Sequence, residues 1–243
     1  EELDNYGIYD WSAASSDNVT PSRLLPEVSK PELHYFPIPG RGFAVRVAMF
    51  STFGKDGWVD TKMPFADFAP AKAAMLEGSE GPLVAAPYMP QLTLPSGKAI
   101  AEAVPISKWA ATAKGPSSLY PADPDTRLAI DEAIELIYAA SQAPGGATPE
   151  ETKAAREKFS SGAMKMNIEL YQKRIVGPFL LGDQMTLADL WMFFVFNMIK
   201  SGQFDYVDPS ILDQFPKVIE SFKALMASPL IAEYKAAYGD QYE

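Results

Sequence analysis

The sequence predicts a mixed α/β domain followed by an all-helical domain. Three observations predict this fold class. Apolar runs of strand length alternate with helical patterns up to residue 113, and residues 114–124 are rich in Pro and Ser. Beyond that stretch the apolar residues recur at helical spacing. We therefore expect an extended arm over residues 1–31, an α/β domain over 32–113, a linker over 114–124 and a helical domain over 125–243.

The elements of the α/β domain are expected in the order β-α-β, then β-β-α. A Pro/Gly loop over residues 37–42 separates the first strand from the first helix, and Pro95-Ser96-Gly97 separates the two strands of a hairpin. Pro105 is tolerated because it falls in the first turn of the last helix. In chain order we expect a strand at 33–36, a helix with apolar residues at 44–50, a strand at 58–60, a hairpin of 91–94 and 98–100, and the helix that contains Pro105.

The helical domain carries two strong helix starts. Thr148-Pro149-Glu150-Glu151 combines an N-cap, a Pro and an acidic N3 residue, and its helix should run to about Arg174. Thr186 is followed three residues later by Asp189, which has the form of a capping box. The helix after it is apolar on nearly all sides, so we expect it to be buried and its capping motif to be structural.

The composition excludes several kinds of site. The 243-residue chain has no Cys, which excludes a disulfide framework, a Cys-ligated zinc, an iron–sulfur cluster and a cysteine nucleophile. Its one His, His34, cannot by itself build a multi-His metal site. We expect no metal, and we expect His34 to be a satisfied strand residue rather than a catalytic one.

The charge distribution points away from nucleic acid. The net charge is −10, which repels phosphate backbones. Residues 32–113 carry seven acids and seven bases, whereas both flanking segments are acidic, so a site for an acidic small molecule is expected in this middle segment. The richest apolar stretch, 187–199, is too short for a membrane span and is interrupted by Asp189 and Asn197.

Three features of the first domain suggest chemistry. Tyr35 lies beside the Pro/Gly loop, and a Tyr hydroxyl there can stabilise a thiolate; the alternative is a strand aromatic packed into the core. Arg41 in the loop is free to meet a ligand, whereas Arg46 in the helix suits a structural ion pair. Pro90 directly precedes a strand, and a cis Met89-Pro90 bond would let the Met89 main chain pair with an extended peptide; the alternative is an ordinary trans Pro.

These motifs together resemble the glutathione transferase superfamily, over about residues 32–240. The stretch from Tyr35 to Arg46 is similar to the first strand and helix of Pi- and Sigma-type members. Leu180-x-Gly182-Asp183-x-x-Thr186-x-Ala188-Asp189 is similar to the superfamily's buried capping motif. The resemblance implies a thioredoxin-like N-terminal domain, an all-helical C-terminal domain, and glutathione as co-substrate without a metal.

The resemblance also implies a set of site residues. Tyr35 takes the place of the tyrosine that activates glutathione, and Met89 with Pro90 takes the place of the pair that binds the cysteinyl backbone. Glu102-Ala103 stands where the family usually has Gln-Ser or Glu-Ser, so one hydroxyl is missing. The remaining implied glutathione-binding residues are Arg41 in the loop, Phe68 and Lys72 in place of a Trp…Lys pair, and Glu132. In sequence, Glu132 falls near the position of an acidic residue that, in family dimers, reaches the glutathione site of the partner subunit.

Two functions follow from the resemblance. The first is transfer of glutathione to an electrophilic, mostly apolar small molecule, with a homodimer as the expected assembly. The second is a non-catalytic relative that serves as a binding or scaffold subunit, held in a larger complex through residues 1–31, whose Tyr6, Tyr9 and Trp11 are aromatic. The first residue is Glu, and we expect a cytoplasmic protein or, after removal of a targeting peptide, one in a plastid or mitochondrion.

Overall fold

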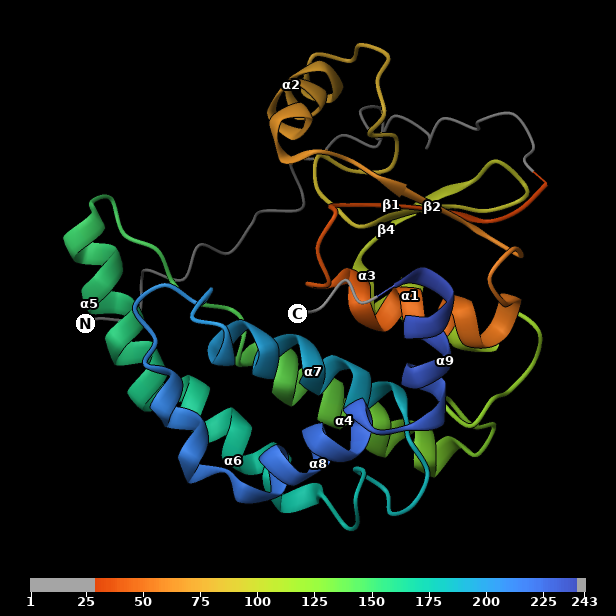
Figure 1. Ribbon diagram of the computed structural model, residues 1–243. Helices are drawn as coiled ribbons and strands as arrows, with labels where there is room; N and C mark the ends of the chain where they lie inside the picture. The colour runs from red at the N-terminus through yellow and green to blue at the C-terminus, as the bar shows by residue number, and fades with distance from the viewer. Residues whose placement is uncertain (1–28, 240–243) are drawn as a thin grey trace, which may run out of the picture.

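The computed structural model describes residues 29–239, so most of the expected N-terminal arm lies outside the described residues. Figure 1 shows a small sheet above a larger helical body, with α1 and α3 between them and α2 beyond the other side of the sheet. The first part comprises β1 (Glu32–Tyr35), α1 (Gly42–Phe53), β2 (Val59–Lys62), α2 (Phe65–Leu76), β3 (Gln91–Thr93), β4 (Ala99–Ala101) and α3 (Ala103–Thr112).

The sheet has the strand order β2-β1-β3-β4. β1 runs parallel to β2, with Tyr35 opposite Lys62, and antiparallel to β3, with Leu33 opposite Leu92. β3 and β4 form the expected hairpin. The parallel pair is joined through α1, as a parallel connection requires.

The helical body follows in chain order. It consists of α4 (Pro124–Ala139), α5 (Pro149–Phe159), a π-helical stretch η3 (Ser160–Met164), α6 (Lys165–Arg174), α7 (Leu187–Lys200), a 3-10 helix η4 (Pro209–Gln214), α8 (Pro216–Met226) and α9 (Pro229–Tyr238). The helix expected from Thr148 to about Arg174 is therefore present as α5, η3 and α6 in succession. Thr148 and Glu151 form a full capping box at its start.

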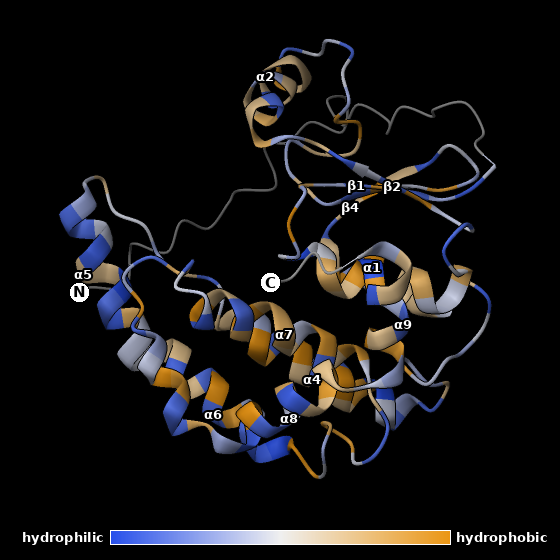
Figure 2. Ribbon diagram, viewed as in Figure 1, coloured by the Kyte–Doolittle hydropathy of each residue, from blue (hydrophilic) through white to orange (hydrophobic). Residues whose placement is uncertain are grey.

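Helix α7 forms the centre of the core, and its capping motif is as expected. Asp189 is fully buried, and its carboxylate accepts hydrogen bonds from the Thr186 N–H (2.8 Å), the Thr186 hydroxyl (2.9 Å) and the Leu180 N–H (2.8 Å). Burial raises the pKa of Asp189 to about 6. Figure 2 shows α7 as mainly hydrophobic, in contrast to α5, which has no buried residue.

The two parts of the molecule share one core across α1, α3 and α7. The ring of Phe43 stacks on that of Phe193 at a centroid distance of 3.7 Å. The Trp191 indole N–H donates to the Ser107 hydroxyl at 3.1 Å, and both residues are fully buried. This core fixes α7 against the α/β domain, so residues from both can face one cleft.

Helix α2 has no counterpart among the elements expected from apolar spacing. Only Ala71 of this helix is buried, and Pro70 lies inside it, so the sequence shows no apolar face of helical period. Within residues 29–239, none of the helices is both long enough and apolar enough to cross a bilayer.

Candidate functional site

The loop after β1 folds onto the ring of Tyr35. Tyr35 is 5% exposed, and its hydroxyl oxygen accepts a hydrogen bond from the Arg41 main-chain N–H at 3.1 Å. A Cβ at Gly40, where φ is +40°, would lie 2.7 Å from the Tyr35 hydroxyl oxygen, and one at Gly42 would lie 2.5 Å from the ring. Glycine at both positions thus permits the close approach of loop and phenol.

The Tyr35 hydroxyl is placed as a hydrogen-bond donor. Burial raises its pKa above the usual value of 10, against the opposing effects of the Arg41 N–H and of the Arg41 and Arg46 charges. The phenol therefore stays protonated near neutral pH. Because its oxygen accepts from Arg41, its own proton is free for another acceptor, and accepting one hydrogen bond strengthens the donation of the next.

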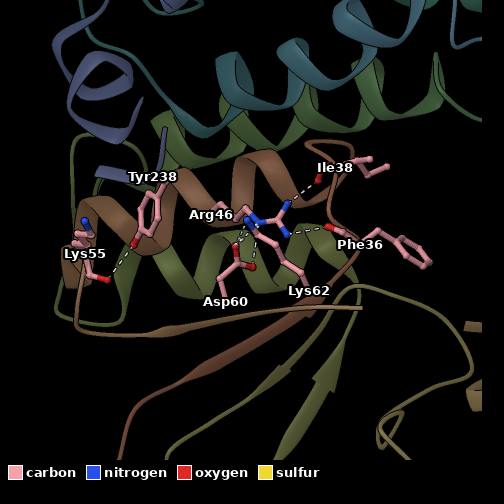
Figure 3. Close-up of polar contacts among 7 residues, drawn as sticks. All are labelled: Phe36, Ile38, Arg46, Lys55, Asp60, Lys62 and Tyr238. Carbon is pink, nitrogen blue, oxygen red and sulfur yellow. Dashed lines mark hydrogen bonds and ion pairs between the residues drawn. The ribbon is translucent and has the colours of Figure 1, made fainter. Parts of the chain in front are cut away.

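Arg46 fastens the same loop from inside the protein, as Figure 3 shows. Its side chain is 1% exposed, and its guanidinium donates to the main-chain oxygens of Phe36 (2.9 Å) and Ile38 (2.6 Å). Its Nε lies 3.0 and 3.1 Å from the two carboxylate oxygens of Asp60 on β2. The expected structural ion pair is present, and it also fixes the conformation of the loop beside Tyr35.

The Met89-Pro90 peptide bond is cis, as one of the two interpretations of this dipeptide required. Within residues 29–239, no hydrogen bond involves the main chain of Met89. The segment before it is held by the buried side chain of Gln91, whose amide oxygen accepts from the Val84 and Ala85 N–H groups. The Gln91 amide nitrogen donates to the main-chain oxygen of Tyr88 at 3.0 Å.

Two adjoining cavities meet at Arg41 and Met89. The larger, which we call the cleft, has a volume of about 810 Å³ and is lined by Tyr35, the loop after β1 and the face of α7. Its walls include the rings of Phe193 and Phe194, with Asn197 among the polar groups. The smaller, which we call the recess, has about 190 Å³ and is lined by Arg41, Tyr88, Met89, Pro90, Glu102, Ala103 and Tyr138.

The structure brings six of the nine predicted site residues to these cavities and leaves three elsewhere. Phe68 packs edge-on against the ring of Phe36 at 5.2 Å and lines neither cavity. Lys72 is exposed on α2 and also lines neither. Glu132 pairs with Arg174 of its own chain and borders a separate surface hollow. The six are Tyr35, Arg41, Met89, Pro90, Glu102 and Ala103.

Glu102 and Tyr88 form a pair in the recess. Glu102 has φ +82° at the start of α3, an uncommon conformation for a residue with a side chain. A hydrogen bond to its carboxylate raises the pKa of the Tyr88 hydroxyl. Tyr88 did not stand out in the sequence, because nothing near it there indicated a contact with the start of α3.

Other cavity residues were also missed. Tyr138 comes from α4, and the Arg41 guanidinium lies 5.4 Å from the centre of its ring. Phe193 and Phe194 belong to the apolar run after Thr186, whose pattern predicts burial, and both are almost fully buried while they line the cleft. No local sequence signal distinguishes such residues from ordinary core residues.

His34 lies outside both cavities. Its Nε2 is 3.5 Å from a carboxylate oxygen of Glu32, and burial lowers its pKa below 6.5 despite that carboxylate. Within residues 29–239, no three acidic or His side chains are grouped so that they could hold a metal ion.

Comparison with known proteins assigns the architecture. Residues 140–237 match the family model of the glutathione S-transferase C-terminal domain. The chain has the glutathione transferase fold. The resemblance to this superfamily, with a thioredoxin-like domain before a helical one, is confirmed, whereas the Pi- and Sigma-like subtype stays a prediction. No curated protein matches the sequence.

Several solved structures are similar to this chain. They include a rat hPGDS complexed with a quinoline (TM-score 0.67, 13% identity, 85% of this chain and 96% of that one). A glutathione transferase homolog from Sulfitobacter, with bound glutathione, has TM-score 0.64 and 17% identity over 86% of this chain and 98% of that one. The Pi-class enzyme of Onchocerca volvulus has TM-score 0.60 and 19% identity over 86% and 93%.

Proposed function

We propose that the protein is a glutathione transferase that conjugates the glutathione thiolate to an electrophilic, mostly apolar small molecule. The observation that carries this proposal is the position of the Tyr35 hydroxyl. It lines the cleft together with Met89, the residue before the cis Pro90, and its proton is free to be donated. The Sulfitobacter homolog with bound glutathione supports the choice of co-substrate.

The residues present fit a γ-glutamyl tripeptide. The Met89 N–H and C=O, which have no partner among residues 29–239, would pair with the cysteinyl main chain. In the recess, the Arg41 guanidinium would attract the γ-glutamyl carboxylate and the Glu102 carboxylate would accept from its amine. The expected hydroxyl is absent at Ala103, and Tyr88 supplies a hydroxyl in the same recess.

Tyr35 would act on the protonation of the thiol. A free thiol has a pKa of about 8.5, so only a few per cent is thiolate at neutral pH. By donating a hydrogen bond to the sulfur, Tyr35 would favour the anion over the thiol, and the released proton would go to solvent. The sulfur lone pair would then form the S–C bond at the electrophile, with the leaving group departing, in a cleft walled by Phe193 and Phe194.

The test is turnover of a chlorodinitrobenzene with glutathione by the wild type and by Tyr35→Phe at equal folded concentration. Removal of the hydroxyl keeps the ring, so folding and glutathione binding should barely change while kcat falls by about 10²–10³-fold, the usual effect of losing one activating donor. Tyr120→Phe is the matched control, because its hydroxyl bonds Asp131 outside both cavities. It should retain wild-type turnover.

Equal and substantial turnover by the wild type and Tyr35→Phe would contradict the assigned role of Tyr35. Absence of both turnover and glutathione binding in the wild type would instead support the second candidate function, a non-catalytic binding or scaffold subunit. Two observations favour that candidate: Ala103 lacks a hydroxyl, and Lys72 lies away from both cavities. Deletion of residues 1–31 would then release the protein from its partners. As an enzyme, the chain is proposed to form a homodimer.

A further inference from the structure

One amide side chain interrupts the apolar wall that α7 gives to the cleft. Asn197 lines the cleft from this helix and is half-buried. The two charged side chains of α7 have partners: Asp189 accepts the capping hydrogen bonds, and the Lys200 ammonium lies 5.2 Å from the centre of the Phe222 ring. Within residues 29–239, the Asn197 carboxamide makes no hydrogen bond. A half-buried amide without a protein partner, in the wall of a cavity, is available to a molecule bound there.

Phe193 fixes where Asn197 lies along the cleft. The Phe193 ring stacks on that of Phe43. The Phe43 N–H donates to the main-chain oxygen of Gly40 at 3.2 Å, in the loop that closes on Tyr35. Asn197 follows Phe193 by four residues, so the two lie on one face of α7, about 6 Å apart along its axis. The carboxamide is therefore one helical turn away from the ring that adjoins this loop.

Asn197 belongs to the part of the site that the second substrate would occupy. Helix α7 contributes no residue to the recess, where Arg41 and Glu102 would hold the γ-glutamyl end of the tripeptide. Asn197 lines the cleft together with Tyr35 and Phe194. Since the sulfur would lie at Tyr35, the carboxamide borders the space beyond it. The wall there is aromatic, and an amide N–H in apolar surroundings interacts more strongly with developing negative charge than one in water does.

We propose that Asn197 activates the electrophile, and that this electrophile carries a carbonyl group conjugated to the carbon that is attacked. The inference rests on the glutathione transfer proposed above. The thiolate sulfur forms a bond to the far carbon of the C=C–C=O unit, and the C=C electron pair shifts so that negative charge develops on the carbonyl oxygen. The side-chain N–H of Asn197 donates to this oxygen as its charge grows. The enolate then takes a proton from solvent at the carbon next to the carbonyl, and no group leaves.

Two electrophiles separate this role from a general effect on the cleft. Benzylideneacetone has the conjugated carbonyl, whereas benzyl chloride has no oxygen or nitrogen that could accept from Asn197. Asn197→Leu removes the donor and keeps a branched side chain of similar size. It should lower kcat for benzylideneacetone about 10- to 100-fold, as the loss of one hydrogen bond to a charged oxygen implies, and leave kcat for benzyl chloride and KM for glutathione within about twofold. Asn197→Asp, which replaces the donor with a carboxylate of the same shape, should lower kcat for benzylideneacetone at least as much.

Asn167→Leu is the matched control, with far-UV circular dichroism to confirm folding of every variant. It makes the same substitution on α6, outside both cavities, and should change neither rate by more than about twofold. An equal loss for both electrophiles in Asn197→Leu, or no loss for either, would overturn the role of Asn197. Wild-type turnover of benzyl chloride without turnover of benzylideneacetone would also overturn it, and both results would leave the proposed glutathione transfer standing. Absence of wild-type turnover of both electrophiles would refute the transfer itself and the inference with it.

Discussion

Replacement of Arg46 by Met would test how the loop beside Tyr35 is held. Arg46 is 1% exposed, and the Asp60 side chain that it pairs with is 15% exposed. The substitution keeps an unbranched apolar chain of similar length but removes three interactions: the ion pair with Asp60 and the hydrogen bonds to the main-chain oxygens of Phe36 and Ile38.

The magnitude follows from these contacts. Removing one partner of a buried ion pair typically costs about 3–5 kcal/mol. Asp60 keeps a second cation, Lys62, whose Nζ lies 4.0 Å from a carboxylate oxygen, but this lysine is 37% exposed, so the remaining pair recovers only about 1 kcal/mol or less. Loss of the hydrogen bond to the main-chain oxygen of Phe36 costs about as much and offsets that recovery. The main-chain oxygen of Ile38 belongs to an exposed residue and can form a hydrogen bond to water instead, so its loss adds nothing to the expected decrease in stability. We therefore expect Arg46→Met to lower the free energy of unfolding by about 3–5 kcal/mol. For a chain of this size the melting temperature should fall by about 6–20 °C.

The assay is urea denaturation followed by far-UV circular dichroism, with Arg41→Met as the matched control. Within residues 29–239, the Arg41 guanidinium forms no ion pair and lies over the ring of Tyr138, an interaction of about 0.5–1 kcal/mol at a partly exposed site. Arg41→Met should therefore lose about 1 kcal/mol or less. If Arg46→Met loses no more than Arg41→Met, the assignment of Arg46 as the anchor of the loop is wrong.

Three further predictions concern residues outside the reacting centre. Thr186→Ala should lower the free energy of unfolding by about 1–2 kcal/mol because it removes a hydroxyl from the buried capping motif of α7, and an unchanged denaturation midpoint would contradict this. Gln91→Leu should lower the free energy of unfolding by about 2–4 kcal/mol, because it removes the hydrogen bonds between the side-chain amide and the segment before Met89. A decrease below about 1 kcal/mol would show that water replaces those hydrogen bonds. The single imidazole, His34, should titrate below pH 6.5 by NMR, and because the unfolded chain then binds its proton first, the contribution of His34 to stability should fall as the pH drops below about 6.5. The raised pKa of Asp189 acts in the opposite direction, so the His34 contribution is measured as the difference between the wild type and His34→Gln at each pH, and a folded-state pKa above 6.5 would reverse its sign.

The sequence was most informative where the determinants are local. The capping box at Thr186 and Asp189 is set by residues three positions apart, and the apolar run after it is long enough to require burial. Likewise the Pro/Gly loop after Tyr35 could be recognised because the residues that shape it are adjacent in the chain. These motifs were sufficient to predict the two-part architecture.

The rest of the site depends on tertiary packing. Tyr138 and Phe194 reach the cavities only because α4 and α7 pack beside the α/β domain, and their sequence environment is that of ordinary core residues. Lys72 shows the converse. Its spacing from Phe68 matched a family pattern, but α2 buries only Ala71, and the lysine lies on an exposed part of that helix.

The pKa of the glutathione thiol in the complex is the measurement that tests the central claim most directly. It can be followed by the ultraviolet absorbance of the thiolate as the pH is raised, for the wild type and for Tyr35→Phe. If Tyr35 donates to the sulfur, the wild-type thiol should titrate at least about one unit below its free value of about 8.5, and in Tyr35→Phe it should return towards that value. A thiol that binds with the same pKa in both proteins would contradict the role of Tyr35.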